Sequence, residues 1–278
     1  MLLLEPQSVL KLIIKIYKKW WKKITQDNND FYVLEDDQLS LTKIIVLSLI
    51  PGILALIFDI IAAPIVQQSG YPLFFTLVLA NIIVLLPSEL LILIYFGYKK
   101  NKRFSIKGII PYRKSMPNKN LVLWIIILVA YGYVINMVIF PISGMLKKFL
   151  TWMPEVVFSA ESDVITSTNF QLYSSTVLIT VLIATLLINA ILIPIIEELY
   201  FRGYLLPRTS RFGKITAILN VSLWAIYHIW APWTIIANLI IFTPIAYMVM
   251  KKKDVRLSIF AHMIANFLLV ITMVPLLI

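Results

Sequence analysis

Residues 174–200 read SSTVLITVLIATLLINAILIPIIEELY. A helix needs about 20 consecutive apolar residues to cross the hydrocarbon core of a bilayer, which is about 30 Å thick. This run carries no charge before the paired glutamates at its end, so we predict a transmembrane helix here. Six other stretches have the same character, at about 44–66, 72–96, 121–143, 215–231, 233–250 and 256–277. The predicted fold is an all-α polytopic membrane helix bundle with about seven transmembrane helices.

The composition agrees with a membrane protein. Of the 278 residues, 60% are hydrophobic and 14% are charged, whereas soluble proteins are about 45–50% apolar. The mean hydropathy is +0.88. Cysteine is absent, which excludes disulfides, thiolate nucleophiles and cysteine-based zinc or iron–sulfur sites. The net charge of +11 is explained by basic cytoplasmic loops, so we predict no nucleic-acid partner.

The distribution of Lys and Arg predicts the orientation of the chain. The sequence has 25 of these residues, and all but Lys147 and Lys148 fall before the first predicted span or in alternate connections. Cytoplasmic loops carry an excess of Lys and Arg. We therefore expect a multi-pass protein of the cell membrane with a cytoplasmic N-terminus and an external C-terminus. The Ile-, Lys- and Asn-rich usage indicates a bacterial source.

The segment before the first span is expected to lie on the membrane. Residues 8–24 place lysines at helical spacing opposite Leu, Ile and Trp side chains, which predicts an amphipathic interfacial helix on an anionic inner leaflet. Residues 25–40 are acidic and Asn-rich and are predicted to form a linker. The chain then divides into 1–43, which holds this helix and linker, 44–119, which holds the first two spans and a cytoplasmic loop, and 120–278.

A few polar side chains fall inside the predicted spans. An ionisable group at mid-membrane costs about 2.5–3.5 kcal/mol on insertion scales, so each one requires a reason. The set consists of Asp59, Glu89, Glu197, Glu198, His228, His262 and Asn266. For Asp59 and Glu89 we expect contacts between helices or a supporting role. The other five lie in the C-terminal half and predict a functional site.

Spacing along the chain predicts which of these groups meet. We place a turn at residues 211–214, and Glu198 lies as many residues before Gly213 as His228 lies after it. In an antiparallel helical hairpin, equal separation from the turn gives similar depth. Glu198 and His228 are therefore expected to meet, unless Pro207 ends the first helix early and shifts the match by about a turn.

The residues of the last span share a face. His262 and Asn266 stand at i and i+4 and can point into one cavity. Glu198 and Arg202 have the same spacing, which favours an ion pair and leaves Glu197 as the freer carboxylate. A poorly solvated carboxylate suits a general base. The set then predicts peptide-bond hydrolysis by water, with Asn266 and His262 stabilising the oxyanion.

The same atoms permit a metal site. Glu197, His228 and His262 make up a ligand set used by catalytic zinc ions, with one position left open for water. If Glu197 binds a divalent metal such as zinc, only Glu198 is left as a base, and that residue is committed to Arg202. We prefer a reaction that requires no cofactor, and the metal remains an open alternative at this stage.

Three motifs resemble those of the CPBP intramembrane protease family, the CAAX protease and bacteriocin-processing enzymes. Glu197-Glu-Leu-Tyr-Phe-Arg202 matches EExxxR, Trp224-Ala-Ile-Tyr-His228 matches FxxxH with Trp in place of Phe, and His262-Met-Ile-Ala-Asn266 matches HxxxN. The resemblance covers roughly residues 120–278. It implies that Glu197 and His228 activate water, that His262 and Asn266 stabilise the oxyanion, and that Glu198 and Arg202 support them.

The resemblance also implies the class of substrate. A CAAX-type enzyme would cleave a lipidated protein near its C-terminus, and the bacterial branch of the family suggests maturation of bacteriocin or pheromone peptides, or immunity to them. We prefer the second. Two other functions remain open from the sequence, namely a non-catalytic membrane scaffold that regulates a partner protein and a small-solute transporter.

Overall fold

The computed structural model describes residues 37–113, 116–150 and 170–277. The predicted interfacial helix at 8–24 and most of the predicted linker at 25–40 lie outside the described residues. The described part is helical and contains no strand, only an isolated bridge between Arg113 and Asp254. The predicted all-α polytopic bundle is confirmed.

Four long helical rods come first along the chain. They are α2 (Leu41–Gln68), then α3 (Phe75–Ala80), η2 (Asn81–Leu85) and α4 (Leu86–Asn101) as one rod, then α5 (Asn118–Phe149), and finally α7 (Ser175–Leu187), η4 (Ile188–Leu192), α8 (Ile193–Glu198) and η5 (Leu199–Leu205) as one rod. The segments η2, η4 and η5 are π-helical turns. Ser40 and Ser174 begin α2 and α7 by accepting hydrogen bonds from Lys43 and Val177 backbone amides.

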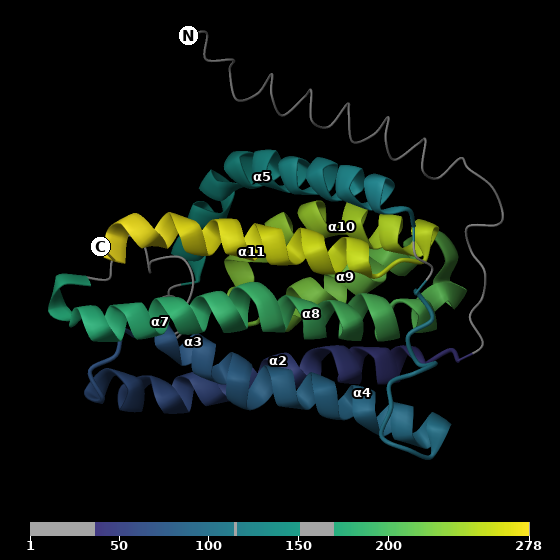
Figure 1. Ribbon diagram of the computed structural model, residues 1–278, viewed down its shortest axis with the longest axis horizontal. Coiled ribbons are helices and arrows are strands. Elements are labelled where there is room, and N and C mark those ends of the chain that lie inside the picture. The colour runs from purple at the N-terminus through teal and green to yellow at the C-terminus, as the bar shows by residue number, and fades with distance from the viewer. Residues whose placement is uncertain (1–36, 114–115, 151–169, 278) are drawn as a thin grey trace, which may run out of the picture.

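The remaining elements complete the bundle. They are the 3₁₀ segments η3 (Phe170–Leu172), η6 (Pro207–Ile215) and η7 (Pro232–Thr234), and the helices α9 (Thr216–Tyr227), α10 (Ile235–Lys252) and α11 (Arg256–Leu277). In Figure 1, α10 lies against α5 and α9, α2 packs on α9, and α11 packs on α5 and on the rod of α7 and η4.

About seven spans were expected, and one of them takes a different form in the described residues. Five described helices are long and apolar enough to cross a membrane, and α11 has 22 residues. The predicted span at 215–231 is instead α9, which has 12 residues and is shorter than the roughly 20 needed. It is shortened because the chain turns in η6, where Gly213 adopts a positive φ of 58°, and because His228 leaves the helix with a ψ of 47°.

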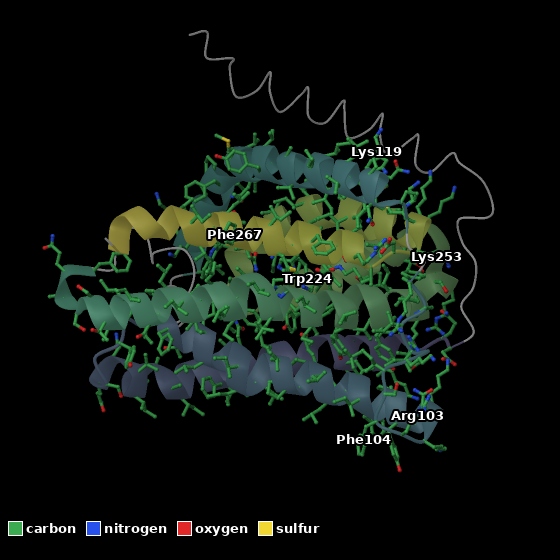
Figure 2. The ribbon with its side chains drawn as sticks, in the orientation of Figure 1. Arg103, Phe104, Lys119, Trp224, Lys253 and Phe267 are labelled. Carbon is green, nitrogen blue, oxygen red and sulfur yellow. The ribbon has the colours of Figure 1, made fainter. Side chains whose placement is uncertain are left out.

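Basic side chains gather at one end of the bundle. Figure 2 shows Arg103, Lys119 and Lys253 at the same end, although they lie at the ends of three different helices. The end at which α4 and α10 stop is therefore the end that the Lys and Arg pattern predicts to be cytoplasmic.

Several prolines lie inside the helices, and at three of them a side chain from another helix donates to the carbonyl that is left without its helical partner. Proline has no N–H, so Pro51 in α2 leaves the carbonyl of Leu47, four residues earlier, without its helical donor. The hydroxyl of Tyr200 donates to this carbonyl over 2.7 Å. In the same way Pro244 in α10 leaves the carbonyl of Ile240, which accepts from the Tyr131 hydroxyl over 3.1 Å.

The third proline follows a π-helical turn. In η4 the amide of Ile193 donates to the carbonyl of Ile188, five residues earlier. The next donor in this register would be residue 194, which is Pro194, so the carbonyl of Asn189 has no helical donor. The side-chain amide of Asn266 donates to it over 2.8 Å. Because hydrocarbon offers backbone groups no partner, these three side chains satisfy the carbonyls and join the helices.

At the basic end of the bundle, the Asp254 carboxylate links the connection between α10 and α11 to the segment before α5. Asp254, between α10 and α11, accepts from the backbone amide of Met116 over 2.9 Å and from the guanidinium of Arg256 over 2.7 Å. Burial acts to raise the pKa of the Asp254 carboxyl, but the hydrogen bonds from Arg256 and Met116 outweigh it and hold that pKa below its ordinary value.

We predict that Tyr200→Phe lowers thermal stability through Pro51. The Leu47 carbonyl would lose the side-chain donor that Tyr200 provides, at a cost of about 0.6–1.7 kcal/mol. In a Pro51→Ala background, residue 51 regains an amide that can donate to the same carbonyl, so the same change should cost little. Thermal unfolding of the four detergent-solubilised variants measures this coupling. Tyr133→Phe, at an exposed position, is the control, and an equal loss in both backgrounds would contradict the assignment.

We also predict a pH dependence for Asp254. Because its pKa is lower in the folded protein, the stabilisation is complete above about pH 4, the ordinary value of an unfolded aspartate, and disappears as the pH falls through the folded pKa. Asp254→Asn should therefore unfold at a lower temperature than the native chain near pH 7, with a loss of about 1–2 kcal/mol. The difference should shrink on acidification below pH 4. A difference that stays constant there would show that ionisation of Asp254 is not its source.

Candidate active site

The ion pair expected from the i, i+4 spacing is present and fully buried. Arg202 lies 3.3 Å from Oε1 of Glu198, and both side chains have 0% exposure. The same carboxylate oxygen is 3.1 Å from Nδ1 of His262 on α11. Glu198 therefore connects the rod of α8 and η5 to α11, and it is committed to two partners.

Glu197 lies between the two histidines of the chain. Its Oε1 is 3.8 Å from Nε2 of His228, and its Oε2 is 3.8 Å from Nδ1 of His262. Both distances exceed the range of a direct hydrogen bond. Glu197 is thus the carboxylate with the looser contacts, and it faces imidazoles from two separate elements.

His228 is held at the end of a helix. Its Nδ1 is 2.8 Å from the carbonyl oxygen of Trp224, which can only accept. The neutral ring therefore carries its proton on Nδ1, and Nε2 presents a lone pair toward Glu197. Because α9 ends at Tyr227, the imidazole is placed where the chain leaves the helix, with 14% of its side chain exposed.

Aromatic side chains surround these groups. The Arg202 guanidinium carbon lies 4.5 Å from the ring centre of Trp224 and 5.4 Å from that of Phe242. Trp224 also contacts the rings of His228 and His262, edge to face, at 4.5 and 5.8 Å. The larger indole at the position where the family has Phe thus packs on the cation and on both imidazoles, and fixes their orientation.

The side chain of Asn266 is engaged by the backbone of η4. Its amide nitrogen donates to the Asn189 carbonyl, and Asn189 also accepts from Asn81 over 2.8 Å. Among the described residues, no hydrogen bond or ion pair joins Asn266 to Glu197 or His228. One of its two N–H groups is therefore used by the backbone of η4, and only the second can serve an oxyanion.

Glu89 belongs to the surroundings of the site. It has 0% exposure, and its Oε1 accepts from the Tyr227 hydroxyl over 2.8 Å. Tyr227 also interacts with Glu197 and directly precedes His228. Glu89 can therefore have the supporting role expected for it, because it holds the hydroxyl of Tyr227. Asp59 is buried in α2, a helix that carries none of the six predicted site residues.

One sequence-based expectation shifts by a residue. Glu198 was expected to meet His228 across the turn, but Glu197 faces His228 while Glu198 faces His262. The equal-depth argument assumed two regular helices. The π-helical η5, the 3₁₀ segment η6 and the short α9 change both depth and rotation, so the adjacent carboxylate occupies the predicted place.

The set considered as metal ligands is Glu197, His228 and His262. His228 directs Nε2 toward Glu197, but Nδ1 of His262 lies nearer to Glu198 than to Glu197, at 3.1 against 3.8 Å. Within the part of the chain that the structure describes, no group of three His, Asp or Glu side chains is placed to hold a metal ion. In this arrangement His262 is engaged by Glu198 and does not complete the set, and we derive no step through a metal.

Sequence reasoning missed the contributions of Tyr227 and Asn189. A tyrosine beside a histidine and a single asparagine in an apolar run are common features of helix interiors. The sequence did contain one indication for Asn189. It stands five residues before Pro194, and a π-helical turn leaves the carbonyl at that position without a donor.

Comparison with protein-family models gives a match over part of the chain. Residues 179–268 match the family model described as type II CAAX prenyl endopeptidase Rce1-like. The matched range runs from α7 into α11 and contains Glu197, Glu198, Arg202, His228, His262 and Asn266. Searches of curated proteins and of solved structures each gave no match.

We predict that breaking the buried Glu198–Arg202 ion pair destabilises the protein mainly because one charge is left buried without its partner. Arg202→Met leaves the Glu198 carboxylate buried without its cation, which costs about 3–5 kcal/mol. Adding Glu198→Gln removes the unpaired charge and should recover part of the loss. Thermal unfolding of the single and double variants measures this, with Arg211→Met at an exposed position as the control. A double variant as unstable as the sum of the single changes would refute the prediction.

Proposed function

We propose that this chain is an intramembrane endopeptidase. The premise is that residues 179–268 match the family model described as type II CAAX prenyl endopeptidase Rce1-like. Glu197 and His228 would activate the attacking water. The observation that carries the proposal is the position of the Glu197 carboxylate, 3.8 Å from an imidazole nitrogen of His228 and 3.8 Å from one of His262.

The separation of these groups suits a water molecule between them. A contact longer than about 3.5 Å between two polar groups is commonly bridged by water. Nε2 of His228 and the Glu197 carboxylate are both acceptors, so each can receive one of the two protons of a single water. This orients the water oxygen and makes it a better nucleophile.

Hydrolysis can then proceed with the residues of the chain. The water oxygen attacks the carbonyl carbon of the scissile peptide, while Glu197 takes one of its protons. The oxyanion that forms would be stabilised by the second N–H of Asn266 and by the Nε2–H of His262, which the ring carries when both of its nitrogens are protonated, since Nδ1 faces Glu198. When the C–N bond breaks, Glu197 returns the proton to the leaving amine. Glu198 and Arg202 would act by holding His262 and the aromatic cage in place.

The exposure of the site suggests how a peptide reaches it. His228 is 14% exposed, whereas Glu198 and Arg202 are completely buried. The substrate would approach from the side of His228, at the end of α9. A protease of this family acts on a peptide or prenylated protein, and within that class we propose a membrane-associated or small peptide, in bacteriocin or pheromone maturation or immunity. CAAX-type processing of a lipidated protein is the alternative.

The burial of charge favours an enzyme over a scaffold. Glu89, Glu197 and Glu198 lie in one interior region with a single guanidinium, that of Arg202. Burying several carboxylates is unfavourable unless they are paired, and such clusters are common where proton transfer is required. A surface that only binds a partner does not need them.

We predict that Glu197→Gln and His228→Ala each reduce peptide processing about 10²- to 10⁴-fold, because each removes a group that activates water. Small peptides in the membranes and medium of cells with the native chain or each variant are compared by mass spectrometry. Membrane levels of the protein are measured in parallel.

Asp59→Asn is the matched control, a change from carboxyl to amide at a buried position on α2, and it should leave the peptide pattern unchanged. Native processing by both Glu197→Gln and His228→Ala at normal membrane levels would end the catalytic proposal and favour the scaffold. Solute flux that needs Asp59 or Glu89 but not Asn266 would favour the transporter.

A further inference from the structure

Helix α2 lies directly against the peptide group that precedes His228. A Cβ atom at Gly52 of α2 would overlap the carbonyl oxygen of Tyr227 and would lie 3.0 Å from Cδ2 of its ring. No side chain can approach a backbone oxygen so closely, so any larger residue at this position must displace α2 or the Tyr227 peptide. Because glycine has no Cβ, α2 can rest on the end of α9.

The register of α2 at this point is fixed by a neighbouring contact. Gly52 follows Pro51, and the hydroxyl of Tyr200 in η5 donates over 2.7 Å to the Leu47 carbonyl that Pro51 leaves without its helical donor. This link holds α2 against the rod that carries the paired glutamates. It therefore also keeps Gly52 opposite Tyr227.

The hydroxyl end of Tyr227 is held by a different helix. It donates to Oε1 of Glu89 in α4 over 2.8 Å, and both residues have 0% exposure. Between its two ends, the Tyr227 ring lies 5.0 Å from the ring of Phe201 and 5.0 Å from that of His228, edge to face in both pairs. Tyr227 is thus held at its carbonyl by α2, at its hydroxyl by α4 and on its ring by η5.

The position of Tyr227 determines where His228 lies. Helix α9 ends at Tyr227, and His228 leaves the helix with a ψ of 47°. The imidazole is joined to the Trp224 carbonyl through Nδ1, and its Nε2 lies 3.8 Å from Glu197. Since His228 directly follows the Tyr227 peptide, a shift of that peptide moves the imidazole relative to both of these groups.

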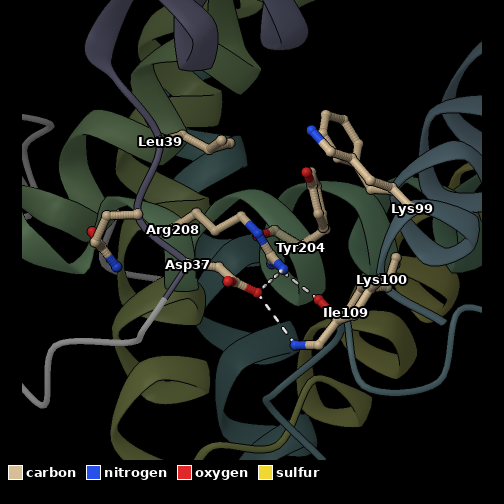
Figure 3. Close-up of a pocket in the computed structure, with 9 residues that line it drawn as sticks. Asp37, Leu39, Lys99, Lys100, Ile109, Tyr204 and Arg208 are labelled. Carbon is tan, nitrogen blue, oxygen red and sulfur yellow. Dashed lines mark hydrogen bonds and ion pairs between the residues drawn. The ribbon is translucent and has the colours of Figure 1, made fainter.

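The far end of α4 has different neighbours. Figure 3 shows Lys99 and Lys100 there, with Arg208, around a cavity of about 340 Å³. None of the residues that meet at the end of α9 lines this cavity. Gly97 stands at the same end of α4, and a Cβ atom on it would overlap the carbonyl oxygen of Ser105. Gly97 thus makes the same kind of close backbone contact as Gly52, away from the candidate active site.

We infer that Tyr227 is a positioning residue for His228, and that Gly52 and Glu89 hold it in place. The inference deepens the proposed function and rests on it for the effect on peptide hydrolysis. It makes α2 and α4 part of the active centre, although both lie outside residues 179–268, which match the family model. A displacement of about 1 Å near a reacting group can lower a rate about 10²-fold, so these contacts would control hydrolysis without touching the substrate.

The first test observes His228 by nitrogen NMR. The chain has two histidines, so the full-length protein in detergent with isotope-labelled histidine shows two imidazoles, and His228→Ala identifies one of them. At about pH 8, where an ordinary imidazole is neutral, His228 should show one tautomer, with well-separated signals from its two ring nitrogens. Gly52→Ala should bring these signals closer together, because the displaced ring loses its bond to Trp224 and adopts both tautomers.

Gly97→Ala is the matched control. It places a Cβ atom against a carbonyl oxygen in the same way, but about 12 Å farther along α4 than Glu89. A general loss of packing should be similar in the two variants, whereas the His228 signals should move only in Gly52→Ala. Unmoved His228 signals in Gly52→Ala would overturn the inference, and so would an equal movement in Gly97→Ala.

Two changes at Glu89 separate positioning from proton transfer. The side-chain oxygen of Gln accepts from the Tyr227 hydroxyl as a carboxylate does, whereas Leu accepts nothing. We expect Glu89→Gln to keep the native His228 signals and native processing, and Glu89→Leu to change the signals as Gly52→Ala does. In a Tyr227→Phe background, Glu89→Leu should have no further effect. If Glu89→Gln is as defective as Glu89→Leu, Glu89 acts through its charge and the inference is wrong.

Peptide processing, compared by mass spectrometry at equal membrane levels, is the second readout. It should fall about 10²-fold in Gly52→Ala and in Glu89→Leu. Loss of processing with unmoved His228 signals would overturn the positioning role and leave the peptidase proposal intact. Moved signals with native processing would also overturn it, if Glu197→Gln abolishes processing. If processing survives Glu197→Gln as well, the peptidase proposal fails, whereas the moved signals still support the hold of Gly52 and Glu89 on His228.

Discussion

The backbone carbonyl of Asn189 lies inside an apolar bundle and needs a hydrogen-bond donor. The position of the candidate site depends on which group provides it. Pro194 removes the backbone N–H that would bind it, and Asn266 supplies one from α11. The same solution joins Tyr200 to the Leu47 carbonyl opposite Pro51. A missing hydrogen bond is expensive where no water is present. At these positions a polar side chain joins the interrupted helix to a neighbour, and these links help to position the rod that carries the paired glutamates.

The carboxylates at the centre of the bundle impose a second requirement. Glu198 contacts Arg202 and His262 through one oxygen, and Glu89 accepts from the hydroxyl of Tyr227. Glu197 has longer contacts with the two imidazoles. The three carboxylates thus differ in the partners that hold them. Trp224 contributes as well, since its ring packs on Arg202 and its carbonyl sets the tautomer of His228.

Local spacing predicted some of this arrangement correctly. The i, i+4 relation of Glu198 and Arg202 predicted their ion pair, because one turn of helix brings such residues together whatever surrounds them. Predictions across the hairpin were less accurate. They assumed regular helices, whereas π and 3₁₀ turns changed the register so that Glu197 took the place expected for Glu198. Asn266 was expected to point into the site with His262, yet one of its amide hydrogens is used by the orphaned carbonyl in η4.

The amino-acid sequence by itself determined that the chain is a helical membrane protein, which end carries the positive charge and which polar residues interrupt its apolar runs. These properties follow from composition and from the partitioning of side chains between water and hydrocarbon. Only the tertiary structure decided which carboxylate faces His228, that Glu89 reaches the site through Tyr227, and that Lys99, Lys100 and Arg208 surround one cavity. Such contacts join residues far apart in the chain, and their geometry depends on where each helix bends or ends.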